Sequence, residues 1–174
     1  SWDTCMHEAG RTRHDNVEIL MKVCDAVLFA HDRKVIHRDI KPQNIMVGKF
    51  GEVSVMDWGI ALRLPEGTHI PGMAKISPSG TPAYMAPEMA TGELPHPAPT
   101  GTSDLYVQQK ACLLIAARNV ITPAKETGEL VDIAYKAMAT DISDRYPTVD
   151  EFQSAIRDYF AHSESTALTD RGET

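Results

Sequence analysis

The sequence contains few cysteines, and those few lie far apart. Cys5, Cys24 and Cys112 form no C-x-x-C pair, so the sequence excludes a conventional zinc site and offers no disulfide framework. Disulfide bonds persist in oxidising compartments and are rare in the cytosol. The scarcity of cysteine therefore favours a reducing, cytosolic setting for this chain.

Positive charge and long apolar runs are also scarce. The 17 lysines and arginines are outnumbered by 24 aspartates and glutamates, for a net charge of −7. This charge argues against a nucleic-acid binder, because phosphate backbones require a basic face. No apolar run approaches the roughly 18 residues that indicate a membrane span, and residues 1–10 lack the charged-then-apolar order of a signal peptide. We therefore expect no membrane segment here, which leaves open a tether elsewhere in a longer parent protein.

The remaining composition, 43% hydrophobic and 24% charged, is that of an ordinary globular protein. Asp15 and Glu18 have the spacing of a capping box, and they precede an apolar stripe with helical intervals that reaches about residue 31. The stripe consists of Leu20, Val23, Val27 and Ala30. Two short β-rich runs, residues 45–47 and 52–56, then flank a Gly-Lys-Phe-Gly turn and predict a hairpin.

The second half of the sequence predicts a long loop and then further helices. Residues 63–101 are rich in proline, glycine, serine and threonine, and long loops of this kind are functional or disordered. Helix returns after residue 103, and Thr148 with Glu151 forms another capping box before the last helix. The later apolar stripes are Leu130, Ile133, Ala134, Ala137 and Met138, followed by Phe152, Ala155, Ile156, Tyr159 and Phe160.

These patterns divide the chain into three parts. Residues 1–14 are polar and without periodicity, so we expect an irregular segment there. Residues 161–174 are expected to form a polar tail that frays. Between them, residues 15–160 are expected to form one domain, mainly α with a small β-hairpin.

Side chains suited to phosphoryl transfer are concentrated in the loop expected at residues 35–44 and at the end of the hairpin. Residues 37–44 are His-Arg-Asp-Ile-Lys-Pro-Gln-Asn, and Asp-Trp-Gly follows at residues 57–59. Phosphoryl transfer to an alcohol needs a carboxylate near the hydroxyl, oxygen ligands for magnesium and a cation on the migrating phosphate. Asp39 suits the first role. Asn44 and Asp57 suit the second, and Lys41 suits the third.

Each of these residues also has a structural interpretation when it is taken singly. Asp39 would cap a loop, Asp57 would form a turn, and His37 would be a hydrogen-bonded core histidine. Met46 and Trp58 would be core residues. The joint spacing of the polar residues favours the chemical interpretation, but His37 keeps its structural one because Asp39 is the better-placed base.

With three later motifs, this pattern closely resembles the eukaryotic-like serine/threonine protein kinases of bacteria. Residues 80–88, Gly-Thr-Pro-Ala-Tyr-Met-Ala-Pro-Glu, are similar to the end of a kinase activation segment. Ser-Asp-Leu-Tyr at 103–106 resembles the start of the family's central helix, and Asp-Arg-Tyr at 144–146 resembles its late arginine motif. The motifs keep the family order over roughly residues 15–160. Val-Met-Asp-Trp-Gly at 55–59, with tryptophan for the usual phenylalanine, is similar to bacterial members.

The resemblance implies the C-terminal lobe of a kinase that transfers the γ-phosphate of ATP to a serine or threonine of a protein substrate, with Mg²⁺ or alternatively Mn²⁺. It makes Asp39 the catalytic base, Lys41 the contact to the phosphate, and Asn44 and Asp57 the metal ligands. A lysine two residues after the catalytic aspartate is typical of serine/threonine kinases, whereas tyrosine kinases usually have alanine there. Thr81 fits the same substrate class, because its family counterpart bonds to that aspartate and lysine.

The resemblance also assigns packing and regulatory positions. It places His37 and Trp58 in a packing spine and Met46 under the adenine. It implies that Arg38 meets a phosphate on the activation segment. The alternatives for the phosphorylated residue, which stay open, are Thr68, Ser77 and Ser79.

The same resemblance pairs Glu88 with Arg145 in a buried ion pair and places Asp104 at the start of the central helix. The sequence departs from the family pattern in two places. It contains no G-x-G-x-x-G loop and no strand lysine of the V-A-I-K type, so we expect the N-terminal lobe to come from missing upstream sequence. The central helix is shortened, because residues 105–107 run directly into residues 108–117.

Two other functions are weighed against an active protein kinase. The departures favour a pseudokinase-like binding or scaffold module, whereas the intact catalytic residues count against the loss of chemistry. A small-molecule kinase with a similar catalytic loop, such as an aminoglycoside phosphotransferase, would lack the Gly-Thr-Pro-x-Tyr-x-Ala-Pro-Glu segment that is present here. The upstream reading frame distinguishes an active protein kinase from a pseudokinase-like module, because a glycine-rich loop and a strand lysine there would indicate part of a working enzyme.

Overall fold

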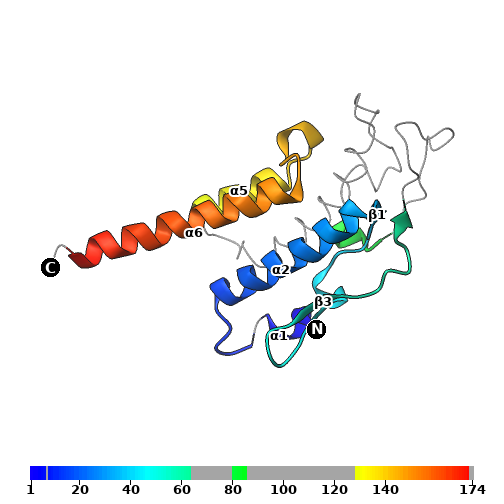
Figure 1. Cartoon of the computed structure of the whole chain (residues 1–174), viewed down its shortest axis with the longest axis horizontal. Coiled ribbons are helices and arrows are strands. Elements are labelled where there is room, and N and C mark those ends of the chain that lie inside the picture. The colour runs from blue at the N-terminus through cyan, green and yellow to red at the C-terminus, as the bar shows by residue number, and fades with distance from the viewer. Residues whose placement is uncertain (7, 64–79, 86–127, 173–174) are drawn as a thin grey trace.

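The computed structural model (Figure 1) describes residues 1–6, 8–63, 80–85 and 128–172 of the chain. The described part is mainly helical, as the sequence predicts. The helices are α1 (Trp2–Cys5), α2 (Arg13–Asp32), α5 (Glu129–Ala137) and α6 (Val149–Gly172). The strands are β1 (Val35–Ile36), β2 (Ile45–Val47), β3 (Val53–Val55) and β4 (Leu62–Arg63), and the 3-10 turns are η1 (Pro42–Asn44), η2 (Pro82–Tyr84) and η3 (Ile142–Asp144).

The cap that begins α2 lies three residues earlier than the sequence predicts. Thr12 Oγ1 accepts a hydrogen bond from the Asp15 backbone N at 3.1 Å, and the Asp15 carboxylate accepts one from the Thr12 backbone N at 2.7 Å. The predicted box of Asp15 and Glu18 is therefore wrong, because Asp15 is the third helical residue and not the cap. The predicted apolar stripe of this helix is confirmed, since all four of its side chains are buried.

The segment before α2 is not irregular throughout, which corrects the expectation for residues 1–14. Residues 2–5 form the helical turn α1, and Trp2 is fully buried. The Trp2 indole Nε1 donates a hydrogen bond to Asn16 Oδ1 of α2 at 2.8 Å. Periodicity does not detect such a turn, because four residues are too few to show a period and too few to form a stable helix alone.

The predicted hairpin is confirmed, and a second strand pair accompanies it. β2 and β3 are antiparallel, with Ile45 opposite Val55 and Val47 opposite Val53. β1 and β4 form another antiparallel pair of two residues each. This pair was not predicted, because β1 lies where the sequence indicates a loop and two-residue strands carry no alternation.

The two C-terminal helices also follow the sequence, with one correction. The α5 stripe is buried except for Met138, which is half-buried. Thr148 Oγ1 accepts a hydrogen bond from the Glu151 backbone N at 3.1 Å and begins α6 as predicted. The helical backbone of α6 continues through the predicted tail to Gly172 and extends beyond the other described elements (Figure 1). None of the helices in the described ranges is long and apolar enough to cross a bilayer.

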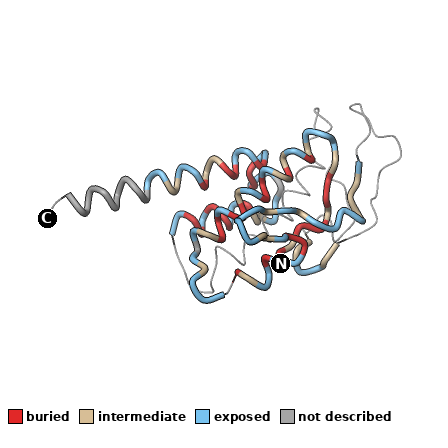
Figure 2. The backbone as a smooth tube through the Cα atoms, turned by 60° about the horizontal axis from the view of Figure 1, so that its bottom comes forward, coloured by how far each residue is buried: buried red, intermediate tan, exposed pale blue. Residues whose placement is uncertain are grey.

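The core lies between α2, α6 and α5 and continues to the loop after β1 (Figure 2). Gln153 of α6 is buried and donates to the Met21 carbonyl and the Asp25 carboxylate of α2, at 3.0 and 2.8 Å. These bonds fix α6 on α2, and α2 leads through β1 to the polar loop. The predicted central helix lies outside the described residues, as do Glu88 and Asp104.

Candidate active site

The loop after β1 and the end of β3 both contain strained backbone. Arg38 has a φ of 69° and Asp57 a φ of 60°, a region that residues other than glycine adopt in only a few per cent of cases. Such residues persist where the surrounding structure holds them, and they cluster at functional sites. Arg38 lies directly before Asp39, and Asp57 is itself one of the polar residues predicted to act together.

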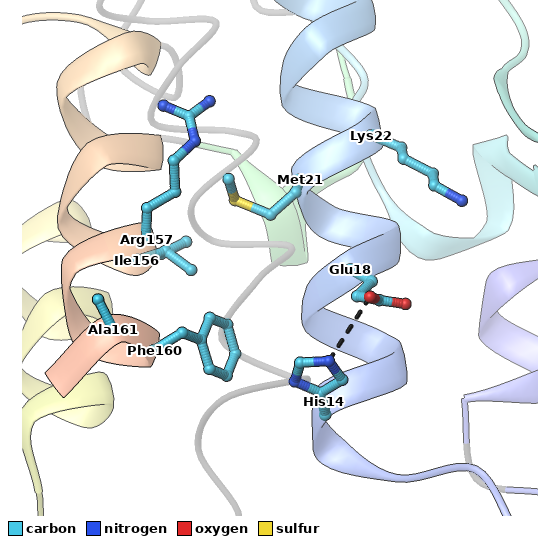
Figure 3. Close-up of a pocket in the computed structure, with 8 residues that line it drawn as sticks. All are labelled: His14, Glu18, Met21, Lys22, Ile156, Arg157, Phe160 and Ala161. Carbon is cyan, nitrogen blue, oxygen red and sulfur yellow. Dashed lines mark ion pairs between the residues drawn. The ribbon is translucent and has the colours of Figure 1, made fainter. Parts of the chain in front are cut away.

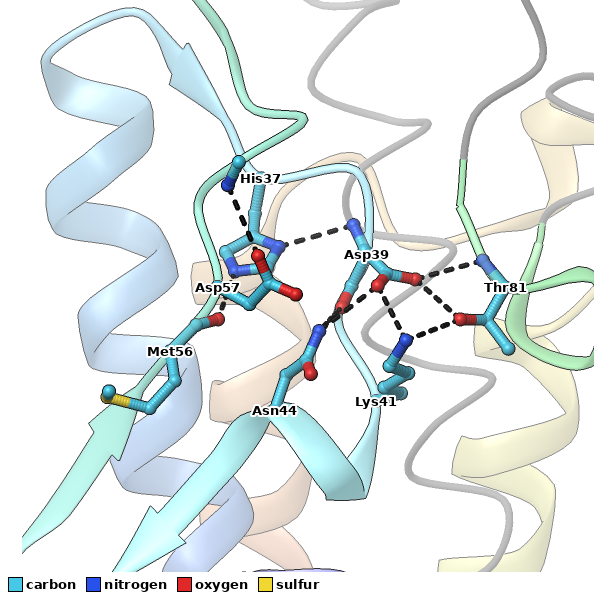
Figure 4. Close-up of polar contacts among 8 residues, drawn as sticks. His37, Asp39, Lys41, Asn44, Met56, Asp57 and Thr81 are labelled. Carbon is cyan, nitrogen blue, oxygen red and sulfur yellow. Dashed lines mark hydrogen bonds and ion pairs between the residues drawn. The ribbon is translucent and has the colours of Figure 1, made fainter.

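The Asp39 carboxylate is the centre of a hydrogen-bond network (Figure 4). Its Oδ2 accepts from Lys41 Nζ at 2.7 Å and from Asn44 Nδ2 at 3.1 Å. Its Oδ1 accepts from the Thr81 backbone N at 2.9 Å and from Thr81 Oγ1 at 2.8 Å. Lys41 Nζ also donates to Thr81 Oγ1 at 2.6 Å, which closes a triangle of side chains. The structure therefore brings together four residues that the sequence predicts as catalytic, although Thr81 lies about forty positions further along the chain.

The surroundings of Asp39 act on its pKa in opposite directions. Burial raises the pKa, whereas the hydrogen bonds from Lys41 and Thr81 and the positive charge of Lys41 lower it. The net effect is a pKa below the ordinary value for aspartate. Asp39 is consequently ionised at neutral pH, which is the form that can accept a proton.

His37 has the hydrogen-bonded structural environment that the sequence predicts. Its Nδ1 accepts from the Asp39 backbone N at 3.2 Å, so Nε2 carries the proton and donates to the Met56 carbonyl at 2.9 Å. Burial is the main cause of its lowered pKa, and both ring nitrogens are occupied. The neutral imidazole therefore ties the loop after β1 to the end of β3 and holds Asp39 in place.

Met46 and Trp58 are not core residues, which corrects their interpretation as single residues. Met46 is 46% exposed and Trp58 is 38% exposed. The Trp58 ring does pack on His37 in a T-shaped arrangement, with a ring-centroid separation of 4.5 Å, and its Nε1 donates to the Val55 carbonyl at 2.9 Å. Exposed apolar surface thus occurs on the hairpin at Met46 and directly after Asp57 at Trp58.

Arg38 connects the loop to the segment after Asp57. Its Nε donates to the Ile60 carbonyl at 2.7 Å, and burial lowers its pKa. The phosphate that the resemblance pairs with Arg38 would sit on residues outside the described ranges, as would the alternatives Thr68, Ser77 and Ser79.

Gly80 is a site residue that the sequence analysis missed. It has a φ of 129°, and a Cβ atom at this position would lie 2.8 Å from the Arg38 carbonyl oxygen. Only glycine allows this approach, and Thr81, the next residue, donates both its hydrogen bonds to Asp39 from there. The sequence feature that could have identified Gly80 is its position directly before Thr81, a residue predicted to be catalytic.

Asn44 and Asp57 have the donor chemistry of a magnesium site. Asn44 Nδ2 donates the hydrogen bonds to the Asp39 carboxylate and carbonyl. Its Oδ1 takes no part in these bonds and can serve as a metal ligand. Asp57 is exposed, and its one hydrogen bond within the described residues is a long contact of 3.4 Å from the Gly59 backbone N. Carboxylate and amide oxygens are ligands that Mg²⁺ accepts, so these two residues fit the ion.

Arg145 is buried in the turn between α5 and α6. It is 3% exposed, its Nε donates to the Ala139 carbonyl at 2.6 Å, and one terminal nitrogen donates to the Thr140 carbonyl at 3.2 Å. A buried guanidinium requires a compensating charge. Its predicted partner, Glu88, lies outside the described residues, so the ion pair stays a prediction.

Replacing Arg145 with alanine should therefore destabilise the protein by about 3 kcal/mol. It should also accelerate amide hydrogen exchange in residues 80–85, because the predicted pair ties Glu88 to the α5–α6 turn. Arg157→Ala is the matched control, since Arg157 of α6 is exposed and its hydrogen bond to Gln153 Oε1 is long at 3.3 Å, so its loss should change stability by less than about 0.5 kcal/mol. Unchanged protection of residues 80–85 in Arg145→Ala would show that the pair does not form.

A groove of about 550 Å³ lies between α2 and α6 (Figure 3). Its α2 side includes His14, Glu18 and Met21, and its α6 side includes Ile156 and Phe160. His14 Nε2 lies 3.5 Å from Glu18 Oε1, and the His14 ring meets Phe160 edge-on at 4.9 Å. Among the residues that the structure describes, none of those predicted for the active site lines this groove.

Comparison with known proteins identifies the family. The protein kinase domain matches residues 3–162. Serine/threonine-protein kinase PknD of Protochlamydia amoebophila is 28% identical over 178 residues, which cover 82% of this chain and 18% of that protein. Serine/threonine-protein kinase PknD of Chlamydia trachomatis serovar L2b is 31% identical over 186 residues, 81% of this chain and 19% of the relative. Serine/threonine-protein kinase PknB of Mycolicibacterium smegmatis is 32% identical over 166 residues, 80% of this chain and 25% of the relative.

The chain thus spans only 18% to 25% of the length of these relatives. The domain match nevertheless covers most of the 174 residues and includes the catalytic-loop, Asp-Trp-Gly and activation-segment motifs. The chain therefore belongs to the protein kinase family and is similar to its bacterial serine/threonine kinases.

Proposed function

We propose that this chain carries the phosphoryl-transfer centre of a protein kinase that moves the γ-phosphate of ATP to a serine or threonine hydroxyl. The observation that carries the proposal is the ionised Asp39 carboxylate, which Lys41, Asn44 and Thr81 hold in one orientation. Phosphoryl transfer depends mainly on positioning and on charge stabilisation, and this network supplies both.

Asp39 is the proposed base. The substrate hydroxyl oxygen attacks the γ-phosphorus, the bond from that phosphorus to the oxygen bridging to the β-phosphate breaks, and ADP leaves. The hydroxyl proton passes to a carboxylate oxygen of Asp39. Because the donors around Asp39 lower its pKa, the carboxylate mainly orients the hydroxyl and receives the proton as the new bond forms.

Lys41 is the proposed cation for the migrating phosphoryl group. A lysine ammonium has three N–H donors, and two of them are used on Asp39 and Thr81. The third is available to a γ-phosphate oxygen. This arrangement supports Lys41 as a link between the base and the group being transferred.

Asn44 and Asp57 are the proposed ligands of Mg²⁺, with Mn²⁺ as the alternative ion. When bound, the ion neutralises charge on the nucleotide phosphates. The exposed Met46 beside these residues would lie under the adenine. The residues of this chain hold the phosphate side of the site, and we propose that an N-terminal lobe from a longer parent protein covers the nucleotide. In that arrangement this chain corresponds to the C-terminal lobe of the kinase.

A serine or threonine substrate is favoured over tyrosine by Lys41 and Thr81, which make the contacts expected of serine/threonine kinases. The decisive experiment is phosphorylation of a mixed peptide library by the parent protein, followed by identification of the modified amino acid. Phosphoserine and phosphothreonine are the expected products. Phosphotyrosine would contradict the substrate assignment, and the absence of any product would favour the pseudokinase-like binding module.

By itself, this chain should bind Mg-ATP with a dissociation constant well above 1 μM, on the order of 1 mM. The reason is that its sequence has no glycine-rich loop and no strand lysine to position the phosphates. Titration calorimetry with Mg-ATP measures the affinity, and the parent protein with its upstream sequence is the control. Micromolar or tighter binding by this chain alone would contradict the prediction.

A further inference from the structure

The short helix α1 lies against the part of the chain that presents Asn44. α1 contacts both η1 and β2, and Asn44 ends η1 directly before β2 begins. Trp2, the buried residue of α1, belongs to the same core cluster as Ile40 and Ile45. Figure 1 shows α1 beside the hairpin, on the side of the N-terminus.

Two hydrogen bonds from one buried side chain hold α1 in place. Asn16 of α2 is 7% exposed. Its Oδ1 accepts from Trp2 Nε1 at 2.8 Å, and its Nδ2 donates to the Met6 carbonyl at 3.1 Å. A helix of four residues is not stable by itself, so the position of α1 depends on this clasp, by which we mean Trp2 and Asn16.

The backbone of Asn44 needs a fixed support, because three parts of the site depend on it. The Asn44 backbone N donates to the Lys41 carbonyl at 2.9 Å, and the Asn44 carbonyl accepts from the Met56 backbone N at 2.7 Å. The Asn44 side chain bonds to Asp39. A shift of η1 would therefore move Asn44 relative to Asp39 and relative to Asp57, the residue after Met56.

We propose that Trp2 and Asn16 are positioning residues, which act through α1 to hold Asn44 in register with Asp39 and Asp57. The contacts of α1 with η1 and β2 support the structural claim, which is that Trp2 and Asn16 fix the position of Asn44. Its catalytic consequence rests on the proposed function, because it requires Asn44 to be a metal ligand. The two parts are separated by measuring hydrogen exchange in this chain and magnesium dependence in the parent protein.

Hydrogen exchange at the Met56 amide is the first measurement. Trp2→Leu removes the ring and the indole N–H, and Asn16→Ala releases the clasp while it keeps the ring. Both should accelerate exchange at Met56 by about tenfold, the factor expected for loss of one buried hydrogen bond with its packing. Trp2→Phe keeps an aromatic ring and should show a smaller acceleration.

Phe152→Leu is the matched control. Phe152 is fully buried like Trp2 but belongs to α6, which contacts α2 and α5. It should lower the melting temperature comparably and leave exchange at Met56 close to that of the wild type. Equal acceleration in Phe152→Leu and Asn16→Ala would overturn the inference, because it would reduce the clasp to a general contribution to stability. Unchanged exchange in Asn16→Ala would also overturn it.

Magnesium dependence in the parent protein is the second measurement. The magnesium concentration for half-maximal turnover should rise about tenfold in Asn16→Ala, as it does when groups that orient a metal ligand are lost, and stay unchanged in Phe152→Leu. An unchanged requirement in Asn16→Ala would overturn the link to the metal. A wild-type parent without kinase activity would contradict the proposed function, whereas the exchange result would still decide whether the clasp positions Asn44.

Discussion

Asp39→Asn should reduce kcat of the parent kinase by about 10²–10⁴ and leave its affinity for Mg-ATP nearly unchanged. In the proposed mechanism Asp39 faces the substrate hydroxyl and contacts no phosphate, so its charge matters when the alcohol attacks. The measurement is kcat on a basic protein substrate, together with Mg-ATP dissociation constants. Because an asparagine amide would meet donors from Lys41 and Thr81, the melting temperature is recorded to confirm that the variant is folded.

Asp57→Asn is the comparison that tests the assignment of roles. Asp57 is proposed to hold the metal, so its loss should weaken Mg-ATP binding as well as turnover. Equal losses of ATP affinity in the two variants would mean that the roles are wrongly divided. Unaltered turnover in a folded Asp39→Asn variant would remove the kinase mechanism proposed for this site.

Gly80→Ala should lower kcat by about 10², the loss expected when a catalytic group is displaced by about 1 Å. The new Cβ would lie 2.8 Å from the Arg38 carbonyl oxygen, which is backbone and cannot rotate away. The segment must therefore move, and Thr81 would lose its bonds to Asp39 and Lys41. The measurements are kcat of the parent protein and its melting temperature.

Gly128→Ala is the control that distinguishes the effect of this steric contact from the effect of backbone strain. Gly128 has a φ of 140°, similar to the 129° of Gly80, but a Cβ atom there would meet none of the described residues within 4 Å. Both variants should therefore lose stability, on the order of 1–3 kcal/mol, because of the unfavourable φ. Only Gly80→Ala should also lower kcat. Equal losses of kcat would show that the approach of Gly80 to Arg38 has no catalytic importance.

The sequence predicted correctly those elements whose hydrophobic pattern extends over many residues, and it missed the shortest ones. The stripe of α2 and the β2–β3 hairpin could be predicted because their hydrophobic periods extend over enough residues to be distinct. The start of α2 was misplaced, because Thr12–Asp15 and Asp15–Glu18 both have capping-box spacing and only the backbone bonds distinguish them. Helix α1 and strand β1 were missed, because elements of two to four residues have no period to detect.

Residue types and their order along the chain were enough to predict the protein kinase family, because the catalytic loop, the Asp-Trp-Gly motif and the end of the activation segment each lie within a few consecutive residues. The folded chain, in contrast, shows how these residues are arranged in space. It placed Thr81 and Lys41 on one carboxylate, showed His37 to be a hydrogen-bonded tie, and left Met46 and Trp58 at the surface. It also brings Gly80 against the Arg38 carbonyl and joins Trp2 to Asn16 by a hydrogen bond. The physical reason is that hydrogen bonds and steric contacts between distant segments depend on distances in space, which neither spacing along the chain nor hydrophobic period specifies.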